Sequence, residues 1–140
     1  MAPADVLRIL QARQQAWDRH DVSSLAADHG DTGYIESPLF ARVQGRADIE
    51  KSYRNLFGWF PDWSLVLDAP IVDGNRAAQY FRAKATHGGE FMGLDATGRR
   101  VEIQGIAIYR FEDGHIAEER RVYDFTGLLL QVGVLRARPT

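Results

Sequence analysis

The most chemically informative residues form a short charged series near the end of the chain. Glu118, Arg120 and Asp124 stand at even spacing in a segment that also contains Ile116 and Val122. Side chains two positions apart on a β-strand point to the same face, so the sequence predicts all five on one face. Carboxylates on an apolar face are costly to bury unless they have partners or a function. This face is therefore the first candidate for a functional site.

Asp124 has the features expected of a general base. On a strand it lies roughly 13 Å from Arg120 along the backbone, so the guanidinium is not expected to neutralise it. An unpaired carboxylate on an apolar wall can take a proton from carbon, and we interpret Asp124 as the residue on which activity depends. The alternative is a structural carboxylate that caps a terminal helix beginning near Thr126.

Glu118 and Arg120 are two positions apart, roughly 7 Å at the backbone, a gap that their side chains can close. Two interpretations stay open: a buried structural ion pair, and a substrate-binding pair in which Arg120 stabilises an oxyanion. As a buried pair, loss of Arg120 alone would cost on the order of 3 kcal/mol.

His87 is the second catalytic candidate. It ends the strand expected to flank the central strand on the side away from Asp124, two inter-strand spacings or roughly 10 Å away. Both side chains would then reach one ligand, and His87 would assist or orient the reacting group. A histidine that anchors the following loop is the alternative interpretation. The spacing of histidines and carboxylates does not predict a metal site.

The elements that must position these residues change character along the chain. Helical spacing of apolar residues predicts helices in the first half, and a period of two predicts strands from Trp63 onward. The expected helices cover 5–20, 23–29 and 48–60, and the expected strands cover 34–38, 63–72, 76–87, 101–111 and 115–124. Helices followed by strands are an α+β pattern, here a curved antiparallel sheet with three N-terminal helices enclosing a cavity.

Asp113-Gly114 is a strong two-residue hairpin signal, and it sets an expected register. Counting back from it, Ala107 faces Arg120 and Ile103 faces Asp124. Small side chains near the middle of the helix-facing surface leave volume for a pocket. These small residues are Ala83, Ala85, Gly105 and Ala107.

Composition narrows the functional classes. With 140 residues, 45% hydrophobic and 26% charged, the chain is expected to form one soluble domain over 1–140. A net charge of -2 without runs of Lys or Arg argues against nucleic acid as a partner. The absence of cysteine excludes disulfides, zinc–thiolate sites and a cysteine nucleophile. No apolar stretch is long enough to span a membrane, so we expect a cytoplasmic protein with no membrane partner.

A series of motifs resembles the SnoaL-like polyketide cyclase family of the NTF2-like superfamily. They occur in the family's order over more than 100 residues. The motifs are His20-Asp21, Gly45-Arg46, Phe60-Pro61-Asp62-Trp63, Thr86-His87 with Gly89 and Phe91, Ala96-Thr97-Gly98, Asp113-Gly114 with Ile116 and Glu118, Asp124, and Gln131 with Gly133.

The resemblance implies a cone-shaped α+β fold with an apolar cavity. In the family's aglycone cyclases an aspartate acts as general acid/base for an intramolecular aldol closure without cofactor or metal, and it aligns with Asp124. The family often has tryptophan where this chain has Arg120, so a charge replaces a stacking surface. Steroid isomerases of the superfamily match less well, because Ser37 and Arg13 stand at their catalytic aspartate and tyrosine positions.

Together these patterns predict a small cofactor-independent enzyme that acts on an apolar carbonyl compound by general acid/base chemistry. The alternative is a non-catalytic domain for small-molecule binding or assembly. Besides the catalytic pair, the expected substrate contacts are Arg120, Glu118, Tyr109, Trp63, Trp59, Phe81, Tyr34 and Tyr53. For the aromatic residues, a place in the core is the competing interpretation.

The outer face of the expected sheet predicts a protein partner. Ile106, Ile108, Tyr123 and Phe125 are apolar where solvent is expected, and such patches mark interfaces. A symmetric homodimer would bury the patch on both copies.

Overall fold

The structure is a computed structural model that describes residues 2–138. Its helices are α1 (Pro3–Asp18), α2 (Val22–Ala27), α3 (Arg46–Trp59) and α4 (Phe125–Val132). Its strands are β1 (His29–Ser37), β2 (Ala41–Gln44), β3 (Ser64–Leu67), β4 (Ile71–Asp73), β5 (Arg76–Thr86), β6 (Arg100–Glu112) and β7 (His115–Tyr123). The expected α+β class is confirmed, with an additional strand, β2, and with Pro70 between β3 and β4 where one strand was expected.

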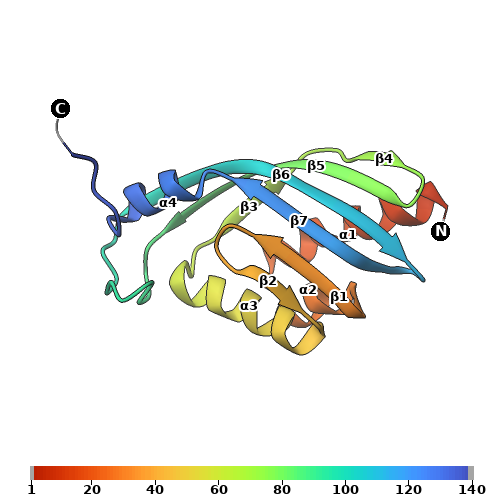
Figure 1. The fold of residues 1–140 in the computed structure, drawn as a ribbon, viewed down its shortest axis with the longest axis horizontal. Coiled ribbons are helices and arrows are strands. Elements are labelled where there is room, and N and C mark those ends of the chain that lie inside the picture. Colours follow the sequence, from red (N-terminus) through yellow and green to blue (C-terminus); the bar gives the residue numbers. More distant parts are fainter. Residues whose placement is uncertain (1, 139–140) are drawn as a thin grey trace.

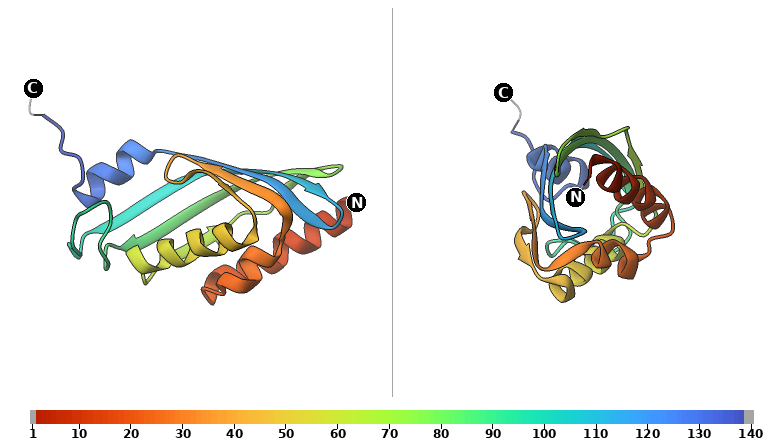
Figure 2. Two further views of the ribbon diagram at one scale, coloured as in Figure 1. Left: turned by 60° about the horizontal axis from the view of Figure 1, so that its bottom comes forward. Right: turned by 90° about the vertical axis from the view of Figure 1, so that its right-hand side faces the viewer.

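One curved sheet forms the body of the molecule, in the order β2-β1-β7-β6-β5-β3, with β4 also paired to β5 (Figure 1). The sheet is mixed rather than wholly antiparallel, because β1 runs parallel to β7. Viewed along its length, the sheet curls into an incomplete ring that α1, α2 and α3 close (Figure 2). No helix within residues 2–138 is both long and apolar enough to cross a membrane.

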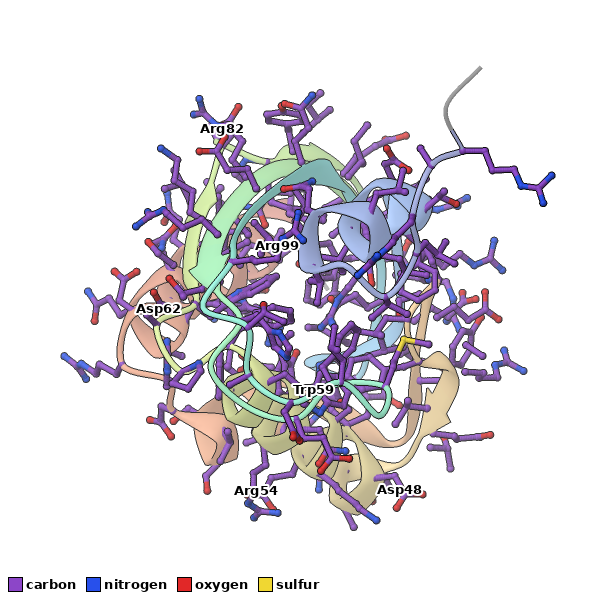
Figure 3. All side chains as sticks on the ribbon, turned by 90° about the vertical axis from the view of Figure 1, so that its left-hand side faces the viewer. Asp48, Arg54, Trp59, Asp62, Arg82 and Arg99 are labelled. Atoms are coloured by element: carbon purple, nitrogen blue, oxygen red, sulfur yellow. The ribbon has the colours of Figure 1, made fainter. Side chains whose placement is uncertain are left out.

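The helices bury one stripe each against the concave face of the sheet. On α1 the buried residues are Val6, Leu10, Arg13 and Trp17, the spacing of one helical face. Arg13 is the only charged residue in this stripe, which is otherwise apolar. In the end-on view, Arg54 and Asp48 of α3 point outward, whereas Trp59 at the end of that helix lies toward the middle (Figure 3).

A β-bulge in β7 decides which of its side chains face inward. Asp113 and Gly114 both have positive φ, as a type I′ turn requires, and Phe111 pairs with Ile116. The next pair is Arg110 with Glu118, so Ala117 has no opposite residue. An extra residue shifts every later side chain to the other face.

The expected register beyond the hairpin is therefore wrong by one residue. Ala107 lies opposite Arg121 instead of Arg120. Glu119, Arg121 and Tyr123 face the helices, and Glu118, Arg120 and Val122 face outward. The acidic and basic side chains that line the cavity are therefore Glu119 and Arg121 instead of Glu118 and Arg120.

The outer face of the sheet has an apolar patch that differs from the expected one. Ile106, Ile108 and Val122 are exposed, with Ile106 directly opposite Val122. Tyr123 was expected in this patch, but the bulge turns it inward, where it packs against Phe81. Phe125 begins α4 and packs against the core.

Homodimerisation through this outer patch stays a prediction. We expect sedimentation at tens of micromolar to give a dimer, because pairing would remove three apolar side chains of each copy from water. Ile108→Glu places a charge in the patch and should give a monomer that melts as a folded protein. A monomeric wild type, or an Ile108→Glu variant of unchanged mass, would contradict the prediction.

Candidate active site

An apolar cavity lies between the concave face of the sheet and the helices. Its free volume of about 50 Å³ accommodates a few water molecules, so a larger ligand requires side chains to move. The lining residues are Trp17, Leu39, Phe40, Leu56, Phe60, Trp63, Leu65, Leu67, Phe81, Ile103, Ala107, Tyr109, Glu119, Arg121, Tyr123 and Leu128. Two charged side chains, Glu119 and Arg121, therefore lie in a wall that is otherwise apolar or aromatic.

Arg121 is held in a fixed orientation by two neighbours. Its Nε donates to Oε2 of Glu119 at 2.6 Å, and its Nη2 donates to the hydroxyl of Tyr53 at 3.0 Å. Burial disfavours its charge, but the adjacent Glu119 carboxylate outweighs this and raises the pKa of Arg121. The guanidinium is consequently a permanent positive charge at the cavity wall.

A second guanidinium, that of Arg13 from α1, lies behind this pair and is 1% exposed. It donates to the Leu25 carbonyl at 3.1 Å, to Asp28 at 2.9 Å and to the Tyr53 hydroxyl at 2.8 Å. Its Nη2 lies 3.6 Å from Oε1 of Glu119. Arg13 thus joins α1, α2, α3 and β7 through hydrogen bonds and charge.

Glu119 is ionised at neutral pH although it is only 1% exposed. Burial alone would raise the pKa of Glu119, but the guanidinium groups of Arg121 and Arg13 lower it to about 2. A buried carboxylate is tolerated when charge partners of this kind compensate its lost hydration. Glu119 therefore holds two positive charges in place and is itself held as an anion.

His29, at the start of β1, completes the buried cluster in its neutral form. The Tyr53 hydroxyl accepts from both Arg13 and Arg121, which leaves its hydrogen for Nε2 of His29 at 3.4 Å. Nε2 must then be unprotonated. Burial is the main cause that lowers the pKa of His29 to about 3, and the positive charge of Arg13 lowers it further.

Two tyrosines of the cavity wall are neutral phenols at physiological pH. Burial raises the pKa of Tyr109, and the nearby Glu119 carboxylate raises it further. Burial also raises the pKa of Tyr123. Each can donate a hydrogen bond to a ligand without losing its proton.

The expected place of Asp124 inside the cavity is wrong. Asp124 is exposed and lies beyond the end of β7, as the N-cap of α4, where Oδ1 accepts from the backbone N–H of Gly127 at 2.8 Å. A Cβ at Gly127 would come within 2.3 Å of this carboxylate, which explains the glycine there. Helix capping, the alternative interpretation from the sequence, is the observed arrangement.

Glu118, Arg120 and Tyr34 also lie outside the cavity, on the outer face of the sheet. Tyr34 and Arg110 both hydrogen-bond Glu118, and Nη2 of Arg120 lies 3.7 Å from Oε1 of Glu118. The pair exists but is exposed, so it contributes much less than a buried pair would. The bulge at Ala117 is the physical reason for the outward placement of Glu118 and Arg120.

His87 is buried but does not line the cavity, and its contacts are those of a loop anchor. Nδ1 lies 2.9 Å from the Thr97 hydroxyl and accepts from the backbone N–H of Thr97 at 3.2 Å. The ring packs against Phe60 and Phe91. The carbonyl of His87 also accepts from the backbone N–H of Gly98, so the residue orders the loop that follows β5.

The remaining expected contacts divide between the cavity and the core. Tyr109, Trp63 and Phe81 line the cavity. Tyr53 lies behind the lining and binds Arg121. Trp59 stacks on Phe40 and contacts Phe91 at a tilt.

Four residues of the charged cluster were missed from the sequence: Arg13, His29, Glu119 and Arg121. The α1 stripe carried a usable signal, because a charged residue there must be buried with a partner. Nothing in the sequence pointed to Glu119 and Arg121. The hairpin turn is an ordinary two-residue turn, so the sequence does not show where a bulge follows it.

Comparison with known proteins agrees with the fold and the motifs. The model of a SnoaL-like polyketide cyclase family matches residues 7–132. The chain belongs to this family. No match was found among curated proteins.

Solved structures give the same result. AclR from Streptomyces galilaeus, a proposed hydroxylase, is 29% identical with a TM-score of 0.83, covering 96% of this chain and 100% of AclR. TsrD from Streptomyces laurentii is 26% identical with a TM-score of 0.81, covering 96% and 99%. IdmH from Streptomyces antibioticus, a proposed polyketide cyclase, is 23% identical with a TM-score of 0.74, covering 90% and 96%. At that identity, IdmH documents the shared fold.

Adjacent glutamates on opposite faces of β7 provide a matched test of the cluster. Glu119→Gln removes the anion between two buried guanidinium groups, and we expect it to lower the free energy of unfolding by about 3 kcal/mol. Glu118→Gln affects an exposed network and should cost less than about 1 kcal/mol. Urea denaturation of both variants measures the difference. Equal losses would contradict the assignment of Glu119 as the inward residue.

The neutral state of His29 predicts a dependence of stability on pH. Its folded pKa of about 3 lies below the unfolded value near 6.5, so the unfolded state binds the extra proton between these values. Stability is therefore fully present above pH 6.5 and falls below it, by about 2 kcal/mol between pH 7 and 5. The loss should be smaller by that amount in His29→Asn, measured by urea denaturation at both pH values. Equal losses in variant and wild type would rule out this role.

Proposed function

We propose that this protein is a small enzyme that binds an apolar carbonyl compound in the cavity. It acts there by general acid/base chemistry of the cyclase or isomerase kind, without a cofactor. The family match supports the cyclase assignment. The designations of AclR as a proposed hydroxylase and of IdmH as a proposed polyketide cyclase support small organic molecules as the ligand class.

The observation that carries the proposal is the position of Arg121. Among residues 2–138 its side chain donates to protein groups through Nε and Nη2, and Nη1 donates to none. The remaining wall is almost wholly apolar, so a carbonyl oxygen has little competition from water for this donor. A fixed positive charge beside a carbonyl stabilises the enolate that forms when a neighbouring carbon loses a proton.

Glu119 is the only carboxylate among the lining residues of the described structure, and we assign it as the proton acceptor. With a pKa of about 2 it is a weak base. The larger part of the rate enhancement is therefore assigned to Arg121, with Tyr109 as a neutral hydrogen-bond donor. Asp124 has no part in this proposal, because it lies outside the cavity.

The second candidate is the non-catalytic binding domain. The low pKa of Glu119 favours it, since a carboxylate beside two guanidinium groups has little tendency to take a proton. Both candidates place a ligand against Arg121, and only the first requires turnover.

Two adjacent arginines give the decisive experiment. Arg121→Met is expected to lower kcat/KM about 100- to 1,000-fold, the typical loss for one oxyanion donor, on an aryl ketone or polycyclic diketone found by screening. Arg120→Met, on the outer face, is expected to change kcat/KM less than about twofold. Melting temperatures of both variants control for folding.

The outcomes separate the two candidates. Comparable turnover by wild type and a folded Arg121→Met variant would contradict the enzymatic proposal. Binding that depends on Arg121, measured calorimetrically and without turnover across the panel, would favour the binding domain.

A further inference from the structure

The cavity is too small in this structure to admit an organic molecule, so part of its wall must move. Its free volume is about 50 Å³, whereas pockets for such ligands typically measure about 300 to 1,000 Å³. Most lining residues belong to helices or strands, and Phe60 and Trp63, between α3 and β3, are buried. Leu39 and Phe40 differ, because they stand in the turn that joins β1 to β2 and are only half-buried.

The β1–β2 turn lies at an edge of the sheet. β2 is the last strand in the sheet order, and within residues 2–138 it pairs with β1 alone. The turn points toward the end of the molecule at which α3 and α4 end (Figure 1). Segments at an edge, with few buried contacts, open at a lower free-energy cost than central strands. Of the elements that line the cavity, this turn is therefore the one best placed to move.

The backbone of the turn is strained where it enters β2. Ala41 has a φ of +56°, a left-handed conformation that a Cβ atom disfavours. Three-residue hairpin loops favour glycine at such a position. An alanine there raises the energy of the observed turn and so reduces the energy needed to reach another conformation.

Two contacts hold the turn in its observed position. The Phe40 ring stacks on Trp59 of α3, with centroids 5.6 Å apart and an interplanar angle of 22°. Burial raises the pKa of Tyr123, and the side chain of Ser37 and the backbone of Leu39 oppose this rise, so both lie close to the Tyr123 hydroxyl. Tyr123 lines the cavity and Trp59 does not. The turn is thus held from the cavity side by Tyr123 and from outside the lining by Trp59.

We propose that the β1–β2 turn, residues 38–41, is the gate of the cavity. Leu39 and Phe40 move outward together to admit a ligand and return once it is bound. Trp59 acts through Phe40 and is a positioning residue that keeps the gate shut. The inference rests on the proposed function only in taking the cavity as the place where a ligand binds.

A gate of this kind controls rates and not affinity. The stacking of Phe40 on Trp59 is present in the closed protein with or without a ligand, so weakening it lowers the cost of opening in both states. Entry and release should then accelerate by the same factor. A residue with a merely structural role would change the melting temperature or the dissociation constant instead.

The test measures both rate constants by stopped-flow fluorescence with prodan, an uncharged aryl ketone whose emission changes in apolar surroundings. Trp59→Leu removes the stacking partner of Phe40 without altering a lining residue. We expect the association and dissociation rate constants to rise together about 3- to 10-fold, the effect of losing one aromatic pair. The dissociation constant should change less than about twofold.

Phe57→Leu is the matched control on the same helix. Phe57 does not line the cavity, and its ring packs against Trp17 and His20. Both rate constants of this variant should stay within about twofold of wild type. Melting temperatures of the two variants show that each is folded.

A measurement on wild type makes the test independent of how the variants fold. Leu39 and Leu65 both line the cavity, the first in the turn and the second in β3. Methyl relaxation-dispersion NMR should show microsecond-to-millisecond exchange at Leu39 and not at Leu65. Equal exchange at both leucines, or none at Leu39, would contradict a gate in the turn.

The kinetic outcomes separate the gate from the proposed function. Unchanged rate constants in a folded Trp59→Leu variant, or equal acceleration in Phe57→Leu, would overturn the gate. If Arg121→Met still weakened prodan binding in that case, the proposed function would stand. Failure of prodan and of the whole aryl ketone panel to bind wild type would count against both.

Discussion

The carboxylate of Glu119 connects the sheet to the helices. It pairs with Arg121 on its own strand, and it lies 3.6 Å from both Arg13 of α1 and His29 of β1. Tyr53 of α3 joins both guanidinium groups through its hydroxyl. Each charge would be costly to bury alone, so each member fixes the position of the others. This cluster therefore fixes the geometry of the cavity wall and the orientation of Arg121.

The cluster in turn depends on one unpaired residue, Ala117. Without that bulge, Glu118 and Arg120 would face the helices, and Glu119 and Arg121 would face solvent. The segment Glu118–Arg121 has two acids followed by two bases, so either register places one carboxylate and one guanidinium inside. What differs is the partner set, because Arg13 and Tyr53 occupy fixed positions on the helices.

This duplication explains which part of the site could be predicted from the sequence. The fold class, the three N-terminal helices and the hairpin at Asp113-Gly114 follow from periodicity and turn chemistry, which are local properties. The presence of an acid–base pair on an apolar face was also predictable. Which acid and which base face inward was not predictable, since the bulge at Ala117 decides this and the sequence does not reveal the bulge. For Asp124, a position just before a helix made capping an equally physical interpretation, and the cap is what forms.

Catalysis and stability make opposite demands on Glu119. As a structural anion it requires strong pairing, which keeps its pKa low, whereas a proton acceptor works best with a pKa near neutrality. Negative charge that develops on a ligand carbonyl at Arg121 would compete for the positive charge now directed at Glu119, and the pKa of the Glu119 carboxyl would rise. Charge that develops on the ligand would therefore strengthen the base as the proton moves, while in the free protein Arg121 and Arg13 keep the carboxylate ionised.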